Sequence, residues 1–251
     1  MKLSFDDVRN TQQGAPALIV AHGPSSNEYL DKIAYYKNLG FVIVGTNDWF
    51  LFHDEEPHYS VMANSVFTIQ TKHVIFNRYN TKLVYADSVD ATPKEMAEQV
   101  LKVDYLPYDQ RHFMGMPCGC GACCSRIDGS RLTIQEELQK YCNADKHYGT
   151  GDTVALHQIA FAILLGCNPI YFVGVDLDYR LGFARNTGNK TSKSVHIGAI
   201  NDYRDNILKD MQTIKEMVTP LGVKIVNLNK ASTWDVFEIG EIDEGFQPNA
   251  S

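Results

Sequence analysis

Short, continuous runs of apolar residues recur along the chain. The clearest apolar runs are residues 17–21 (ALIVA), 41–45 (FVIVG) and 169–175 (PIYFVGV), and a last strand is predicted at 223–228 (VKIVNL), which contains two polar residues. Runs of this length without alternation are typical of strands that are buried on both faces of a parallel sheet. Weaker runs at 60–70 and 82–86 predict further strands.

Helical periodicity fills the spaces between these runs. It predicts helices at 26–40, 92–103, 133–141, 153–166 and 201–218. The fourth of these is almost wholly apolar, and Asp152 or Thr153 can cap it. The alternation of strands and helices favours a single Rossmann-like α/β domain over residues 1–251, with a mostly parallel central sheet and helices on both of its faces.

Residues 104–148 interrupt this alternation. Gly, Cys, Pro and His accumulate there, and only the stretch at 133–141 has a helical pattern. Long irregular segments inside a compact domain are commonly binding loops or lids. We therefore expect residues 104–148 to form a Cys-rich insertion or lid.

The composition narrows the class of protein. With 251 residues, of which 44% are hydrophobic, the chain can bury a full core without support from metal or disulfides. The 30 acidic residues outnumber 23 scattered basic ones, so we do not expect a nucleic-acid groove. No apolar run approaches the ~20 residues of a membrane span, and no signal peptide is evident. A cytoplasmic protein is expected, and a homo-oligomer is left open.

The first turn of the predicted sheet is the first candidate for ligand binding. Gly23, Pro24 and Ser25 follow a buried strand directly, and His22 before them is placed to contact a ligand. Such a turn can direct backbone N–H groups and a hydroxyl at phosphate, aided by the positive end of the next helix. The alternative is a tight strand-to-helix turn with no ligand.

Polar residues also end other predicted strands. Asn47 and Asn64 fall near strand ends, where an amide can hydrogen-bond a ribose or a base, or form a turn. Asp176 ends the 169–175 strand and could bind Mg²⁺, accept a proton or cap the next turn. His196, in a polar loop, is the best candidate general base, whereas His157 lies within the apolar helix and is expected to be a core residue.

The cysteines suggest a possible metal site. Cys118, Cys120 and Cys123 lie close together, and Cys142 or His147 could complete a tetrahedral zinc site. The spacing is not that of a standard zinc knuckle. A structural zinc site, a redox pair and reduced thiols in a loop are the three alternatives.

The order of these motifs resembles that of two related families, the bacterial lipooligosaccharide sialyltransferases and the archaeal 6-hydroxymethylpterin diphosphokinase-like family, which includes flagellin-glycosylating motility accessory proteins. In the sialyltransferases a Gly-Pro-Ser turn follows the first strand, as at 23–25 here, and an Asn ends the next strand, as Asn47 does. Asn64 matches a second Asn in a Val-x-x-Asn setting. The later matches run from 150–151 through the apolar helix to 174–176, and 166–170 looks more like the diphosphokinase-like family.

The resemblance implies a bound nucleotide. It would be held by the Gly-Pro-Ser turn and the two Asn residues, with further contacts from Gly151, Thr153 and Tyr179, the last of which lies close to a phosphate-binding tyrosine of the family. Transfer chemistry would take place beside Asp176. The chain departs from the sialyltransferases where their first Asn is His22 and where their general-base His corresponds to Ala199.

Three hypotheses follow. The leading one is a transferase that moves a sugar from a CMP-activated donor to a glycan acceptor, with His196 or Asp176 as base and catalysis by positioning and stabilisation of the leaving phosphate. The second is a pterin-type diphosphokinase that uses ATP and Mg²⁺. The third, motivated by Ala199, is a nucleotide- or glycan-binding module without catalytic activity.

Overall fold

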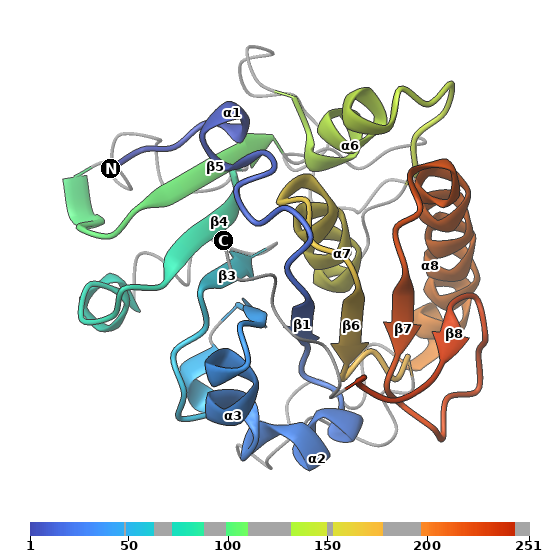
Figure 1. The fold of residues 1–251 in the computed structure, drawn as a ribbon, viewed down its shortest axis with the longest axis horizontal. Coiled ribbons are helices and arrows are strands. Elements are labelled where there is room, and N and C mark those ends of the chain that lie inside the picture. The colour runs from blue at the N-terminus through green and yellow to red at the C-terminus, as the bar shows by residue number, and fades with distance from the viewer. Residues whose placement is uncertain are drawn as a thin grey trace.

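The chain folds around one parallel β-sheet (Figure 1). The computed structural model describes residues 1–47, 49–62, 72–87, 99–109, 132–149, 153–177 and 197–243. Within these residues eight strands are arranged in the order β5-β4-β3-β2-β1-β6-β7-β8, and every neighbouring pair is parallel. The strands are β1 Ala17–Val20, β2 Val42–Thr46, β3 Tyr59–Met62, β4 Lys82–Asp87, β5 Tyr105–Asp109, β6 Ile170–Val173, β7 Ile225–Asn227 and β8 Glu238–Ile239. The predicted Rossmann-like α/β architecture is confirmed.

Helices cover both faces of this sheet. They are α1 Phe5–Val8, α2 Asn27–Leu30, α3 Ile33–Asn38, α6 Ile134–Cys142, α7 Val154–Leu164 and α8 Ile197–Val218. Single 3₁₀ turns lie at Pro24–Ser26, Trp49–Leu51 and Thr219–Leu221. In the described part of the chain no helix is both long and apolar enough to cross a membrane.

The alternating side chains of β1 explain why its sequence is continuously apolar. Ala17 and Ile19 pack into a core that also contains residues of α7 and α8. Leu18 and Val20 point to the opposite face and pack with residues of α2 and α3. Because each face is covered, neither set of positions can be polar without burying an unpaired group.

The prediction of one continuous helix at 26–40 is wrong. The chain there forms the 3₁₀ turn Pro24–Ser26, the four-residue α2 and the six-residue α3, with a break at Asp31 and Lys32. Leu30, Ile33 and Tyr36 still reach the same core, so the apolar spacing survives the break. The positive end of a long helix is therefore not available beside the first turn.

The predicted insertion at 104–148 is wrong at its beginning, which belongs to the central sheet. Residues Tyr105–Asp109 form the edge strand β5, and α6 begins with a capping box in which Thr133 and Glu136 bond reciprocally. The helix predicted at 133–141 is thus confirmed, whereas residues 110–131, with most of the cysteines, lie outside the described residues. The strand predicted at 60–70 is described only as far as Met62, and the helix predicted at 92–103 is described only from Gln99.

Candidate functional site

The candidate site lies where the order of strands reverses. β1 pairs with β2 on one side and with β6 on the other: the chain adds strands β2 to β5 on the first side and then returns to add strands β6 to β8 on the second. Ligands of open parallel sheets bind beyond the carboxyl ends of the strands at such a switch point. Figure 1 shows the ends of β1, β6 and β7 pointing the same way, and the Gly23-Pro24-Ser25 turn follows the first of them.

The turns after β1 and β6 are in close contact. The Gly23 N–H donates to the Gly174 carbonyl at 2.8 Å, and the Gly174 N–H donates to the Ser25 hydroxyl oxygen at 2.9 Å. Gly174 has a φ of +80°, and a Cβ atom on it would lie 2.4 Å from the Ala21 carbonyl oxygen. A glycine is therefore required both by the backbone conformation and by the space between the strands.

The backbone donors of the turn are already used within the protein. The N–H groups of Gly23 and Ser26 donate to carbonyl oxygens of Gly174 and Gly23, and the Ser25 N–H donates to Asp176 Oδ2 at 3.1 Å. The predicted cradle of backbone N–H groups is therefore not supported. The Ser25 hydroxyl accepts one bond, and its own proton has no acceptor among the described residues, so this hydroxyl is the donor that the turn offers.

Asp176 ties three strand ends together. Its carboxylate accepts from the Ser25 N–H after β1 and, through Oδ1, from the Asn229 side-chain amide after β7 at 2.7 Å. The residue is 9% exposed. Both oxygens thus bind N–H donors, which is the capping role that the sequence left open, and its role as a catalytic base stays a prediction. The sequence analysis did not predict Asn229 as a site residue. The only signal for it was its position directly after the strand predicted at 223–228.

His22 lies at the border of β1 and β2. Its Nε2 is 3.1 Å from the Thr46 carbonyl oxygen, and its ring stacks on Phe52 with a centroid separation of 3.6 Å. Since a carbonyl only accepts, Nε2 carries the proton of the neutral ring. Burial lowers the pKa of His22 to about 3, so the ring is neutral at physiological pH and Nδ1 is an acceptor.

Asn47 follows β2 directly and has a φ of +41°. Its N–H donates to the Val61 carbonyl at 3.0 Å, and its own carbonyl accepts from the Ser60 hydroxyl at 3.0 Å. Its side-chain Oδ1 is buried and has no hydrogen-bond partner among the described residues. A buried acceptor without a partner costs free energy, which a donor on a ligand would recover.

Two predictions on α7 concern the same end of the sheet. Thr153 caps the helix, with its hydroxyl accepting from the Ala155 N–H at 3.4 Å. His157 is buried in the first turn and bonds the hydroxyl of Tyr108 at 2.6 Å, which confirms the expected core role. Because Tyr108 lies near the end of β5, this contact brings the start of α7 to the carboxyl edge.

Several predicted site residues lie outside the described residues: Asn64, Gly151, Tyr179, His196, Cys118, Cys120 and Cys123. Cys142 ends α6, and burial raises the pKa of its thiol to about 11, which disfavours the thiolate that a metal requires. No group of three metal-binding side chains occurs in the described ranges. The zinc site stays a prediction.

Comparison with known proteins finds similarity in structure but no match in sequence. No family model matches the chain, and no curated protein matches its sequence. The MAf glycosyltransferase from Magnetospirillum magneticum AMB-1 is similar in structure, with a TM-score of 0.50 and 12% identity over 88% of this chain. This chain spans only 33% of that protein.

The sialyltransferase CstII from Campylobacter jejuni is similar over most of both chains. Its complex with the substrate analogue cytidine-5′-monophosphate has a TM-score of 0.51 and 15% identity, covering 91% of this chain and 86% of that one. Its complex with CMP-3FNeuAc has a TM-score of 0.50 and 17% identity, covering 90% of this chain and 86% of that one. This chain therefore has a sialyltransferase-like glycosyltransferase fold.

Proposed function

We propose that this protein is a glycosyltransferase that uses a CMP-activated sugar, of the nonulosonic acid class, and transfers it to a glycan acceptor. The observation that carries the proposal is the polar cluster of Ser25, Asn47 and His22 at the switch point of a fold that is also found in CMP-binding sialyltransferase CstII. Each of these side chains has a hydrogen-bonding atom that lacks a partner among the described residues.

The open atoms match the chemistry of a nucleoside monophosphate. The Ser25 hydroxyl can donate to a phosphate oxygen, whereas Asn47 Oδ1 and His22 Nδ1 can accept from ribose hydroxyls or a base amine. A neutral His22 also avoids placing a desolvated cation beside the base. The phosphate donor Ser25 and the acceptor His22 thus follow β1, and the acceptor Asn47 follows β2.

The reaction would be a displacement at the anomeric carbon. An acceptor hydroxyl oxygen bonds to that carbon, the bond to the phosphate oxygen breaks, and CMP leaves with the electron pair. We assign the acceptor proton to His196 as general base and the leaving phosphate to Ser25 and Tyr179. Asp176 holds the turns that carry Ser25, so we assign it to positioning through the bonds with Ser25 and Asn229.

Nucleotide binding tests the proposal directly. Thermal shift assays with CMP, cytidine and ATP, each with and without Mg²⁺, are expected to show stabilisation by CMP that does not need the metal. Ser25→Ala should weaken CMP binding about tenfold and leave cytidine binding unchanged, since one charge-assisted hydrogen bond is lost. Asn47→Ala should weaken both ligands.

A matched control exists for the asparagine. Asn143 has a φ of +49°, close to that of Asn47, and is exposed at the end of α6. Asn143→Ala carries the same backbone strain and should bind CMP as the unmodified protein does. No melting-temperature rise with any nucleotide would refute the proposal, and a rise with ATP that needs Mg²⁺ would assign the diphosphokinase alternative instead.

A further inference from the structure

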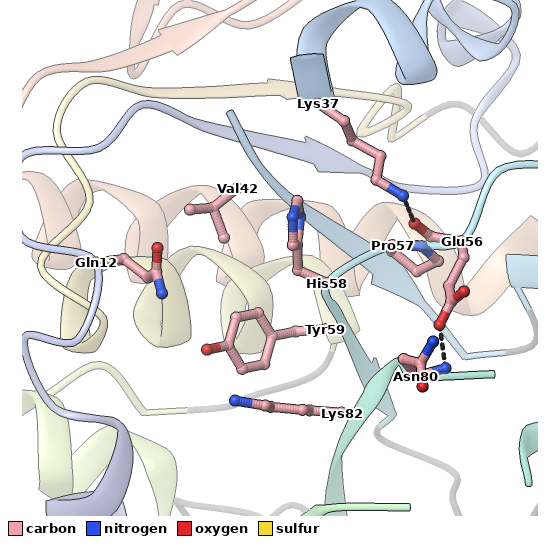
Figure 2. Close-up of a pocket in the computed structure, with 9 residues that line it drawn as sticks. All are labelled: Gln12, Lys37, Val42, Glu56, Pro57, His58, Tyr59, Asn80 and Lys82. Atoms are coloured by element: carbon pink, nitrogen blue, oxygen red, sulfur yellow. Dashed lines mark hydrogen bonds between the residues drawn. The ribbon is translucent and has the colours of Figure 1, made fainter. Parts of the chain in front are cut away.

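A cavity lies at the amino ends of the strands, opposite the candidate nucleotide site at their carboxyl ends. It has a volume of about 320 Å³ and is lined by the first residues of three adjacent strands, Val42 of β2, Tyr59 of β3 and Lys82 of β4 (Figure 2). Cavities of roughly 300–1,000 Å³ are typical of small-molecule sites. Because β2 runs from Val42 to Thr46, the two ends are about 13 Å apart at ~3.3 Å per residue.

Two lysines from separate elements line this cavity. Lys37 of α3 donates to the Glu56 carbonyl oxygen at 2.7 Å, and Lys82 Nζ lies 5.6 Å from the centre of the Tyr59 ring. Figure 2 shows the two side chains on opposite sides of His58 and Tyr59. In the described parts of the chain, no carboxylate lies within 4.0 Å of either ammonium group.

The carboxylate of Glu56, at the wall of the cavity, hydrogen-bonds to groups other than the two lysines. Glu56 accepts from the Asn80 N–H and, at 3.5 Å, from the Thr81 hydroxyl. It is the one acidic residue among the described residues that line the cavity. Among the described residues neither ammonium group is therefore ion-paired, and the cavity carries the two positive charges of the lysines against the one negative charge of Glu56.

His58 adds a neutral donor to the same cavity. The Ile43 N–H donates to His58 Nδ1 at 3.0 Å, so the proton of the neutral ring lies on Nε2. Desolvation of the ring lowers the pKa of His58; the charge of Lys37 lowers it further, the carboxylate of Glu56 raises it, and the charge of Lys82 lowers it. The pKa of His58 therefore responds to the charges that line the cavity.

We propose that this cavity is a second binding site that holds the phosphate or carboxylate group of a small anionic metabolite. Lys37 and Lys82 supply the charge, and the amide of Gln12 and the ring of His58 supply further donors at the wall. Its volume exceeds that of a phosphate ion, which leaves room for the body of a small molecule. The site is independent of the proposed glycosyl transfer, because none of its lining residues belongs to the carboxyl edge.

Titration of His58 by NMR tests this site in the intact protein. The probes are inorganic phosphate and acetate, compared with chloride at equal ionic strength. Phosphate, acetate or both should move the His58 ring signals saturably and raise the pKa of His58, since an anion offsets the two lysines. The more effective anion identifies the group that the site recognises.

Variants separate the site from general charge effects. Lys37→Gln and Lys82→Gln should each weaken binding of the effective anion about tenfold, the size of one charge-assisted hydrogen bond. Lys209→Gln, an exposed lysine on α8, removes the same charge and should have no effect. Equal binding by the Lys37→Gln/Lys82→Gln double variant would overturn the proposal. If the double variant does not fold, the NMR titration of the unmodified protein still tests the proposal. His58 signals that respond no more to phosphate and acetate than to chloride would also overturn it.

Discussion

Individual side chains at the carboxyl edge differ in what their polar atoms already contact. Asp176 has N–H donors on both oxygens, while the Ser25 hydroxyl still has a proton to donate. His22 contributes an acceptor only while its ring is neutral. The hydrogen bonds divide the three residues into a structural clamp, Asp176, a proposed phosphate donor, Ser25, and a proposed nucleoside acceptor, His22.

The protonation of His22 should appear in the pH dependence of stability. Its folded-state pKa is lowered from 6.5 to about 3, so between these values the unfolded chain binds a proton that the folded chain does not. Stability is therefore retained above about pH 6.5 and falls as the pH falls towards 3. By pH 4.5 this amounts to roughly 2–3 kcal/mol, from about 1.4 kcal/mol per pH unit.

Urea unfolding of the unmodified protein and of His22→Gln at pH 7.0 and pH 4.5 measures this contribution. The variant should lose about 2 kcal/mol less than the unmodified protein between the two pH values, because glutamine does not titrate. Parallel losses in the two proteins would show that His22 takes up its proton normally and is not desolvated in the folded state.

At the scale of elements, the sequence predicted the strands best where both faces are covered. β1, β2 and β6 are continuously apolar because helices pack on each side, and their positions were predicted to within a few residues. β5 was not predicted because its sequence, YLPYD, contains Pro107 and three polar or aromatic residues and so has no apolar run. A proline lacks the N–H of a ladder and is tolerated in an edge strand; β5 is the last strand of the sheet beside β4, and on its other side the described residues form only isolated bridges, at Tyr105 and Asp109.

Contacts between elements were less accessible to prediction than the elements themselves. The sequence placed Ser25 and Asp176 at strand ends, but the bond from Asn229 to Asp176 joins residues 53 positions apart and depends on which strands are neighbours. The break between α2 and α3 is likewise set by how the chain packs on β1 and β2. Apolar spacing gives the face of a helix, whereas tertiary packing decides whether it continues.

The contribution of the contact between the ends of β1 and β6 to stability can be tested by adding one methyl group at Gly174. Gly174→Ala places a Cβ atom 2.4 Å from the Ala21 carbonyl oxygen and keeps an alanine at a φ of +80°. Strain of about 1 kcal/mol and overpacking of about 2 kcal/mol predict a loss of roughly 3 kcal/mol in unfolding free energy. Chemical denaturation measures the loss.

Gly222→Ala is the control for backbone strain. Gly222 has a φ of +69°, and a Cβ atom there would have no heavy atom within 4 Å. It should therefore cost only about 1 kcal/mol, the strain of the left-handed conformation. If both variants lost the same amount, the close approach of β1 and β6 would contribute nothing to stability.

For the whole molecule, the parallel sheet separates two kinds of chemistry at its two edges. The carboxyl ends of the strands carry hydroxyl, amide and neutral imidazole groups where the strand order reverses, whereas two lysines without an ion pair among the described residues line a cavity at the amino ends. Strands β1 and β2 form the centre of the core between them, with Leu18, Ile19 and Ile43 fully buried. Both sets of side chains therefore lie on or beside strands of the sheet whose centre is fully buried.

Hydrogen exchange should reveal a gradient of stability from this centre to the edge at β8. The Ala21 N–H donates to Val173 at 2.9 Å between β1 and β6, and the Gly240 N–H donates to Asn227 at 3.0 Å beside β8. The two bonds are nearly equal in length, but Ala21 is buried and both residues of β8 are exposed. Ala21 is therefore expected to exchange only through global unfolding and Gly240 through local fraying, with protection factors that differ by at least about a hundredfold. NMR-detected exchange, corrected for intrinsic rates, gives both values. Similar protection at the two amides would mean that the last strand belongs to the same cooperative unit as the centre, so that the sheet opens as a whole.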